Sequence, residues 1–197
     1  VFDYGENRLA FFIADVSGHG PSAALIVAML KTILLNEKQD YPSPLLMIQR
    51  LNDKLLQVVP EDRFVTAFFG VADFSGKSLT YSCAGHPPPL LLGKNQDAVR
   101  PLSTMGSFLG AFEESEFAEE RIELKSGDKI ILYSDGIFET FNGNGEMYGM
   151  KRLKEVINKN RFASPGEIIK NMLHETDGFW DSKSDRDDIA LLAVEFE

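Results

Sequence analysis

The fold is decided by residues 9–23, which read LAFFIADVSGHGPSA. Leu9 to Val16 form an almost unbroken apolar run, which is typical of a strand buried on both faces. A Gly-His-Gly turn follows, and Pro21 then stands at a position that favours the first turn of a helix. Residues 23–35 are apolar nearly all round and predict a deeply buried helix. An acidic residue, Asp15, therefore lies where a buried strand ends.

The remaining pattern predicts more strands and two pairs of helices. Apolar residues recur at helical spacing after Ser43, and again in residues 150–158 and 165–176, where Ser164 is the predicted cap. Segments rich in β-branched and aromatic residues predict strands at 64–74, 79–85, 90–92, 121–124, 129–133 and 189–196. A turn at 126–128 is expected to join the strands on either side of it. Because the strands come in hairpin-connected groups, the sequence predicts an α+β fold with antiparallel sheets rather than a βαβ alternation.

Composition limits the class of protein. The chain has 197 residues, of which 44% are hydrophobic and 25% charged, which is typical of a globular domain. The longest apolar run has eight residues, against the ~20 that a membrane span needs. A net charge of −10 argues against nucleic acid or an anionic membrane as the main partner. The single Cys83 favours a reducing compartment, so we expect one cytoplasmic domain over residues 1–197.

Three strand ends carry carboxylates. Asp15 and Asp135 each follow a predicted strand, and Asp187 with Asp188 directly precedes the last one. A lone aspartate at such a place is usually a turn residue or a helix cap. Where strands neighbour one another, however, the carboxylates converge, and two of them ~5 Å apart repel by about 3 kcal/mol at an effective dielectric constant near 20. Oxygen ligands without Cys or convergent His favour Mg²⁺ or Mn²⁺ over Zn²⁺.

Two other motif interpretations are weaker. Residues 18–23 fit the dinucleotide pattern G-x-G-x-x-G/A, but Asp15 would face the pyrophosphate, and a second helix follows where a parallel strand is required. The acidic run at residues 181–188 resembles a calcium loop in composition alone. Lys183 would stand at the third ligand position, and the central Gly and the closing Glu are lacking.

Four short motifs together carry a family resemblance. They are Asp15-Val16-Ser17-Gly18-His19-Gly20, Ala84-Gly85-His86-Pro87-Pro88, Ser134-Asp135-Gly136 and Asp187-Asp188-Ile189, in that order. The chain resembles the PP2C-type (PPM) serine/threonine phosphatases and, within them, the bacterial SpoIIE/RsbU branch that dephosphorylates anti-anti-sigma factors. The resemblance implies a sandwich of two antiparallel sheets flanked by helix pairs, with a two-metal centre of Mn²⁺ or Mg²⁺ at one end.

The resemblance also implies roles for particular residues. Asp15 is similar to the carboxylate that binds the metals, with the Val16 carbonyl as a second ligand. Asp135 and Asp187 are similar to the two later metal-binding aspartates, and Asp188 could replace Asp187 if the register differs by one. In such a site a metal-activated water attacks phosphorus, so no protein nucleophile is needed. His19 and His86 are interpreted as parts of the loop architecture.

One family feature lies outside the sequence. The pattern requires another Asp, in a Gly-Gly-Asp stretch on the neighbouring strand, further upstream than the fourteen residues that precede Asp15 here. Asp3 is too close to Asp15 to be that ligand. The chain also opens on Val1 rather than Met. We therefore expect an N-terminally truncated fragment of a longer protein, lacking its N-terminal strand and impaired at its metal centre.

The functional hypothesis is a metal-dependent protein phosphatase that hydrolyses phosphoserine or phosphothreonine of a bacterial regulatory protein of the anti-anti-sigma (STAS) type. The resemblance suggests a sensor or receiver domain upstream in the parent chain and leaves a homodimer open. We expect no contact of this domain with nucleic acid or membrane. The alternative is a catalytically silent, phosphatase-like module that binds a regulatory partner. The retained Asp15, Asp135 and Asp187 favour the enzyme, since a docking module gains nothing from clustered carboxylates.

Overall fold

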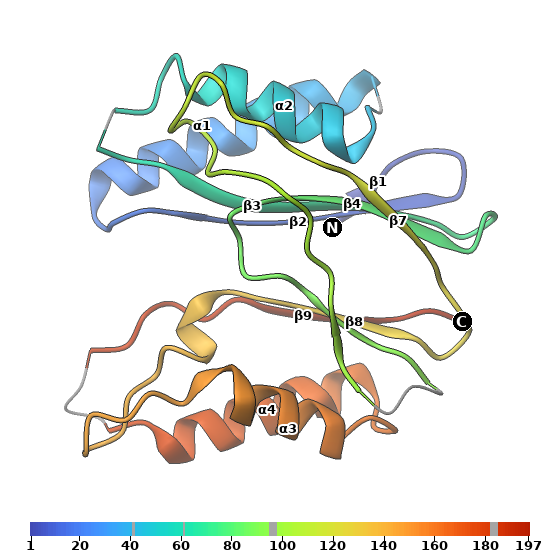
Figure 1. Cartoon of the computed structure of the whole chain (residues 1–197), viewed down its shortest axis with the longest axis vertical. Coiled ribbons are helices and arrows are strands. Elements are labelled where there is room, and N and C mark those ends of the chain that lie inside the picture. Colours follow the sequence, from blue (N-terminus) through green and yellow to red (C-terminus); the bar gives the residue numbers. More distant parts are fainter. Residues whose placement is uncertain (41, 61, 95–97, 182–184) are drawn as a thin grey trace. The chain divides into compact units, whose positions relative to one another are not determined.

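The computed structural model describes residues 1–40, 42–60, 62–94, 98–181 and 185–197. They form two compact units: Val1–His86 with Ser103–Leu124, and Pro87–Leu102 with Lys125–Glu197. Each unit holds one antiparallel sheet and one helix pair (Figure 1). The predicted α+β class with two antiparallel sheets is therefore confirmed. The organisation of residues 1–197 as a single domain stays a prediction.

The sheet of the first unit has five strands in the order β1-β2-β3-β4-β7, all antiparallel. Their bounds are Phe2–Asp3, Arg8–Val16, Val65–Asp73, Ser78–Ala84 and Glu120–Glu123. Two helices, α1 (Pro21–Glu37) and α2 (Pro44–Leu55), cover one face of this sheet, with a short 3-10 turn, η1 (Lys38–Asp40), after α1 (Figure 1). The register of β2 on β3 runs from Arg8 opposite Asp73 to Val16 opposite Val65.

Helix α2 begins where the sequence predicts. The Ser43 hydroxyl accepts a hydrogen bond from the Leu46 N–H at 3.3 Å, and Pro44 occupies the first turn. Its inward face is fully buried against the sheet, with Met47, Ile48, Leu51 and Leu55 among the core residues. The 3.6-residue period of these apolar side chains therefore decides which face of α2 meets the strands.

Helix α1 departs from the prediction of a deeply buried helix. The buried side chains are Ala23, Ile26, Leu30 and Leu34, a single stripe at three- and four-residue spacing. Leu25 is 66% exposed and Val27 52% exposed. The prediction was wrong because apolar residues all round a helix do not require apolar neighbours all round it: α1 packs on the rest of its unit along that one stripe.

The sheet of the second unit has the order β6-β5-β8-β9, also antiparallel. The bounds in chain order are β5 Leu90–Leu92, β6 Arg100–Pro101, β8 Lys129–Tyr133 and β9 Leu191–Glu195. Helices α3 (Gly149–Lys159) and α4 (Pro165–Phe179) cover one face of this sheet (Figure 1). Ser164 and Glu167 form a reciprocal capping box at the start of α4, which confirms the predicted cap.

The strands on either side of residues 126–128 do not pair with each other. Strand β7 belongs to the first unit and β8 to the second, although only residues 124–128 separate them. The turn itself forms, because the Asp128 carboxylate accepts hydrogen bonds from the N–H groups of Lys125 at 2.9 Å and Lys94 at 3.1 Å. A turn motif predicts a change of direction, but it does not fix which strand becomes the neighbour.

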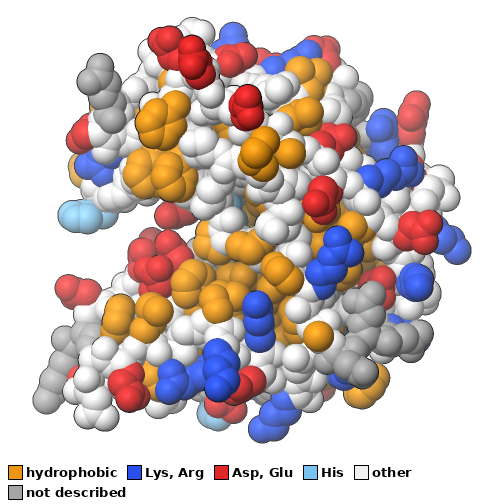
Figure 2. Space-filling model, viewed as in Figure 1, with side chains coloured by type: hydrophobic (Ala, Val, Ile, Leu, Met, Phe, Trp, Pro, Cys, Tyr) orange, Lys and Arg blue, Asp and Glu red, His pale blue; other side chains and the backbone are white. Residues whose placement is uncertain are grey.

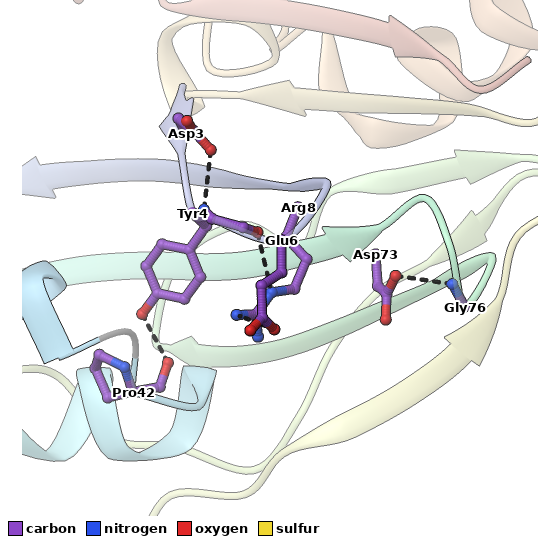
Figure 3. Close-up of polar contacts among 8 residues, drawn as sticks. Asp3, Tyr4, Glu6, Arg8, Pro42, Asp73 and Gly76 are labelled. Atoms are coloured by element: carbon purple, nitrogen blue, oxygen red, sulfur yellow. Dashed lines mark hydrogen bonds and ion pairs between the residues drawn. The ribbon is translucent and has the colours of Figure 1, made fainter.

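Polar contacts close the turns at the Arg8 end of β2 (Figure 3). The Tyr4 hydroxyl donates to the Pro42 carbonyl oxygen at 2.6 Å, and Arg8 Nε donates to a carbonyl of the turn before it at 3.3 Å. The Asp73 carboxylate accepts from the Gly76 N–H at 2.7 Å and closes the hairpin between β3 and β4. These contacts fix the end of β2 opposite to the one that carries Asp15.

Acidic and basic side chains are interspersed over the face that Figure 2 shows, in a chain whose net charge is −10. In the part of the chain that the structure describes, every helix is too short or too polar to cross a membrane.

Candidate metal centre

Two of the predicted site aspartates lie on neighbouring segments of the second unit. Asp135 opens the short 3-10 turn η2 (Asp135–Ile137), which only Ser134 separates from β8, and Asp187 lies in the irregular segment before β9. The residue next to Asp135 ties the two segments together. Ser134 Oγ donates to the Asp188 carbonyl oxygen at 3.0 Å and accepts from the Ala190 N–H at 2.8 Å, and the Ser134 N–H donates to the Ala190 carbonyl oxygen at 3.0 Å. The Ser-Asp-Gly and Asp-Asp-Ile motifs, 54 residues apart, thus form one local structure.

Gly136 is required by the same close approach. The backbone carbonyl oxygens of Asp187 and Asp188 lie where a side chain on residue 136 would stand. The Gly136 carbonyl accepts a hydrogen bond from Thr140 Oγ1 at 2.8 Å, which holds η2 in place. A glycine at this position therefore lets the two acidic segments pack against each other.

The charges of Asp135 and Asp187 act on a third carboxylate, that of Glu139. The Glu139 side chain is exposed, but partial desolvation raises the pKa of its carboxyl above its usual value, and the negative charges of Asp135 and Asp187 raise it further. Glu139 also follows Asp135 by one helical turn, because its N–H donates to the Asp135 carbonyl oxygen at 2.9 Å. Asp135, Asp187 and Glu139 thus share a region of negative potential.

The donor chemistry of this region fits a hard cation. All three side chains offer carboxylate oxygens, which Mg²⁺ and Mn²⁺ prefer, and a bound cation would offset their mutual repulsion. Within the described residues, no group of three or more His, Cys, Asp or Glu side chains is arranged to hold a metal ion. The residues that are present therefore match the cation in charge and ligand type.

Asp15 belongs to the first unit. It is the next-to-last residue of β2 and lies opposite Thr66 of β3, so both side chains are on the same face of the sheet. Its side chain is exposed, whereas Val16 is buried. Thr66 Oγ1 lies 3.0 Å from Nδ1 of the buried His86, which links the Gly-His-Pro-Pro motif to the strand end that carries Asp15. This contact supports the interpretation of His86 as a part of the loop architecture.

The loop after Asp15 is held by the residues that precede β3. The Ser17 N–H donates to the Phe64 carbonyl oxygen at 2.9 Å, and the Phe64 N–H donates back to Ser17 Oγ at 2.9 Å. The Arg63 guanidinium donates to the Ser17 carbonyl oxygen at 2.6 Å. Three hydrogen bonds therefore fix one loop residue beside the candidate ligands.

The motifs did not indicate the contacts of Arg63 and Thr66 in the first unit, or those of Ser134 and Glu139 in the second. Ser134 adjoins a motif aspartate, and Thr66 and Arg63 could have been found by pairing β2 with β3 in antiparallel register. The antiparallel register of β2 on β3 also excludes the dinucleotide-binding interpretation, which requires a parallel strand beside β2. Lys183, which would stand at the third ligand position of a calcium loop, lies outside the described residues. The further upstream Asp concerns residues before Val1 and stays a prediction.

Comparison with known proteins agrees with the motif order. The family model "Stage II sporulation protein E (SpoIIE)" matches residues 5–197. Phosphoserine phosphatase RsbU of Bacillus subtilis is 29% identical over 167 residues, which cover 85% of this chain and 50% of RsbU. The chain spans between about a third and a half of the length of the curated relatives it matches.

Two solved structures illustrate the fold. The RsbU and RsbW domains of Rv1364c from Mycobacterium tuberculosis match 98% of this chain and 52% of that one, with a TM-score of 0.79 and 26% identity. The PP2C phosphatase domain of SpoIIE from Bacillus subtilis matches 100% of this chain and 55% of that one, with a TM-score of 0.82 and 20% identity. The chain therefore belongs to the SpoIIE family, in the SpoIIE/RsbU branch of the PP2C-type phosphatases.

Proposed function

We propose that this chain is the phosphatase domain of a metal-dependent enzyme that hydrolyses phosphoserine or phosphothreonine on a bacterial regulatory protein of the anti-anti-sigma type. The observation that carries the proposal is the joining of the Ser-Asp-Gly and Asp-Asp-Ile motifs through Ser134, in a family member that retains the motif of Asp15. The name of the relative RsbU, a phosphoserine phosphatase, supports the same reaction class.

The proposed metal ligands are the Asp15 carboxylate, the Val16 carbonyl oxygen, and the carboxylates of Asp135 and Asp187. When bound, Mn²⁺ or Mg²⁺ supplies activation of water and neutralisation of charge on the phosphoryl group. The chain's own contribution is geometric. Ser134 and Gly136 hold Asp135 beside Asp187, and the hydrogen bonds of Ser17 hold the loop that follows Asp15.

The parent protein's partners follow from the same proposal. Its substrate would be a phosphorylated STAS-type protein, and a sensor or receiver domain would regulate the phosphatase domain. The silent, partner-binding module is the competing function. The two differ in one measurable property, which is the release of inorganic phosphate.

The test is phosphate release from p-nitrophenyl phosphate and from a phosphoserine-bearing anti-anti-sigma protein, with Mn²⁺ or with excess EDTA. From the parent protein with its upstream strand present, we expect activity with Mn²⁺ and none with EDTA. Residues 1–197 alone should release phosphate much more slowly. Asp187→Asn should abolish turnover, whereas Asp188→Asn is the matched control, because the hydrogen bond at Asp188 uses its backbone carbonyl.

Activity that survives exhaustive chelation would overturn the metal-dependent mechanism. If Asp188→Asn and not Asp187→Asn abolishes turnover, the ligand assignment shifts by one residue. Tight binding of the phosphoprotein without phosphate release would favour the silent module.

A further inference from the structure

Arg63 contacts the loop that follows Asp15. It lies just before β3, 46 residues after Ser17 in the sequence, yet its guanidinium donates to the Ser17 carbonyl oxygen at 2.6 Å. Its side chain is 25% exposed, and its Nε lies 3.9 Å from the carboxylate of the neighbouring Asp62. A hydrogen bond from a charged donor is about twice as strong as a neutral one, so this contact restrains the loop more than an ordinary turn bond would.

The loop is shaped to receive this side chain. Gly18 has a φ of +83°, a left-handed conformation that favours glycine. A Cβ atom built on Gly18 would overlap the Arg63 guanidinium, so the guanidinium fills the space beside the loop that any other residue would need. Arg63 can therefore occupy this space only because residue 18 has no side chain.

The restrained residue stands next to the candidate ligands. Ser17 directly follows Val16, whose carbonyl oxygen is a proposed ligand, and it is two residues from Asp15. The reciprocal bonds between Ser17 and Phe64 fix the N–H and the hydroxyl of Ser17, and Arg63 fixes its remaining polar group, the carbonyl. Together they leave the peptide plane between Ser17 and Gly18 little freedom to rotate.

We propose that Arg63 is a positioning residue for the metal centre: its guanidinium holds the Ser17–Gly18 peptide so that the Val16 carbonyl and the Asp15 carboxylate keep the orientation that metal binding needs. This inference rests on the proposed function. It assigns Arg63 no contact with the substrate. Groups that orient metal ligands typically change metal affinity or activity ~10–100-fold when they are removed.

The test is made in the parent protein with its upstream strand present, and it compares Arg63→Gln with Arg63→Lys and with the control Arg8→Gln. Arg8 is matched to Arg63: its side chain is 29% exposed, it pairs with Glu6 two residues before it, and it donates to a turn carbonyl at the other end of β2 (Figure 3). Mn²⁺ affinity is measured by calorimetric titration, exchange of the Ser17 and Gly18 amide protons by NMR, and hydrolysis with p-nitrophenyl phosphate as the probe.

For Arg63→Gln we expect amide exchange at Ser17 to become about tenfold faster and Mn²⁺ affinity to fall ~10–100-fold. The kcat at limiting Mn²⁺ should fall and recover in excess Mn²⁺, with KM for p-nitrophenyl phosphate unchanged. Arg63→Lys should restore most of the affinity, because one donor is enough to reach one carbonyl. Arg8→Gln should change none of these quantities.

A double-mutant comparison tests independently whether the Arg63 guanidinium occupies the space beside Gly18. Gly18→Ala should lower the thermal midpoint by more in the wild-type background than in Arg63→Ala, because removing the guanidinium relieves the overlap and leaves only the strain of the positive φ. Additive effects would show that the two residues do not share the space as proposed.

Exchange and Mn²⁺ affinity equal to those of Arg8→Gln would overturn the role of Arg63. Faster exchange with unchanged Mn²⁺ affinity and kcat would reduce Arg63 to a loop-stabilising residue, which also overturns it. Failure of the wild-type parent protein, with its upstream strand, to bind Mn²⁺ or release phosphate would instead count against the proposed function. The exchange data would still show whether Arg63 holds the loop.

Discussion

A Cβ atom on Gly136 would lie 2.6 Å from the backbone carbonyl oxygen of Asp188, closer than real Cβ contacts allow. This approach is what brings the acidic segment before β9 against the residue that follows Asp135. The contact is with backbone, which cannot rotate away as a side chain can. The spacing between the two predicted ligand motifs therefore depends on the absence of a side chain at residue 136.

Gly136→Ala should push the two acidic segments apart. We expect a loss of about 1–3 kcal/mol in the free energy of unfolding, the usual range for overpacking, with a larger proportional loss of phosphatase activity. Chemical denaturation and phosphate release measure the two effects. The control is Gly178→Ala in α4, where a Cβ atom would meet nothing within 4 Å and a more stable protein is expected. Equal stability of wild type and Gly136→Ala would contradict the close packing.

Asp135→Asn should abolish most of the turnover without weakening the metal-free fold. Asp135 and Asp187 raise the pKa of Glu139 through their negative charges, so removing one charge relieves repulsion when no cation is bound. In EDTA the thermal midpoint should equal or exceed that of wild type. Asp53→Asn, on the exposed face of α2, is the control for the substitution itself. A midpoint several degrees lower in EDTA would indicate that Asp135 is a structural cap instead.

The two faces of α1 should respond differently to truncation. Leu30 is 4% exposed and belongs to the core of the first unit, so Leu30→Ala should cost about 2–5 kcal/mol of stability through the cavity it leaves. Leu25 is 66% exposed, and Leu25→Ala should stay within about 0.5 kcal/mol of wild type. Denaturant unfolding measures both. A large loss for Leu25→Ala would mean that the exposed stripe is covered in solution.

The capping box of α4 makes stability depend on pH in a defined direction. Hydrogen bonds from the Ser164 hydroxyl and N–H lower the pKa of Glu167, so the ionised carboxylate favours the folded state. A lowered folded pKa contributes stability above the unfolded value, about 4.3 for Glu, and the contribution is lost as pH falls through the folded value. Glu167→Gln should therefore lower the thermal midpoint at pH 7, and the difference should shrink below about pH 4.

Glu114→Gln, on an exposed loop, controls for the loss of one negative charge. A difference between wild type and Glu167→Gln that stays constant from pH 7 to pH 3 would show that the carboxylate's charge does not contribute to the cap.

Local pattern alone determined most of the elements and the order of the motifs. The β-branched and aromatic content identified β3 and β4, the period of 3.6 identified α2, and Ser164 marked the start of α4. These signals lie within one turn or one strand of the residues they govern. The carboxylates of Asp15, Asp135 and Asp187 were identified the same way, since each stands at the end of an apolar run.

Tertiary structure decided what those elements meet. Which sheet receives β7 and which receives β8 depends on pairing energies spread over the whole chain, and the turn between them is compatible with either outcome. The exposed side of α1 could not be read from residues that are apolar all round, because only the packing stripe distinguishes Leu30 from Leu25. Arg63 meets Ser17, and Ser134 meets Asp188, across 46 and 54 residues, because antiparallel register and a side-chain-free glycine bring their backbones together. Such contacts carry no local signal, since each needs a partner that the sequence places far away.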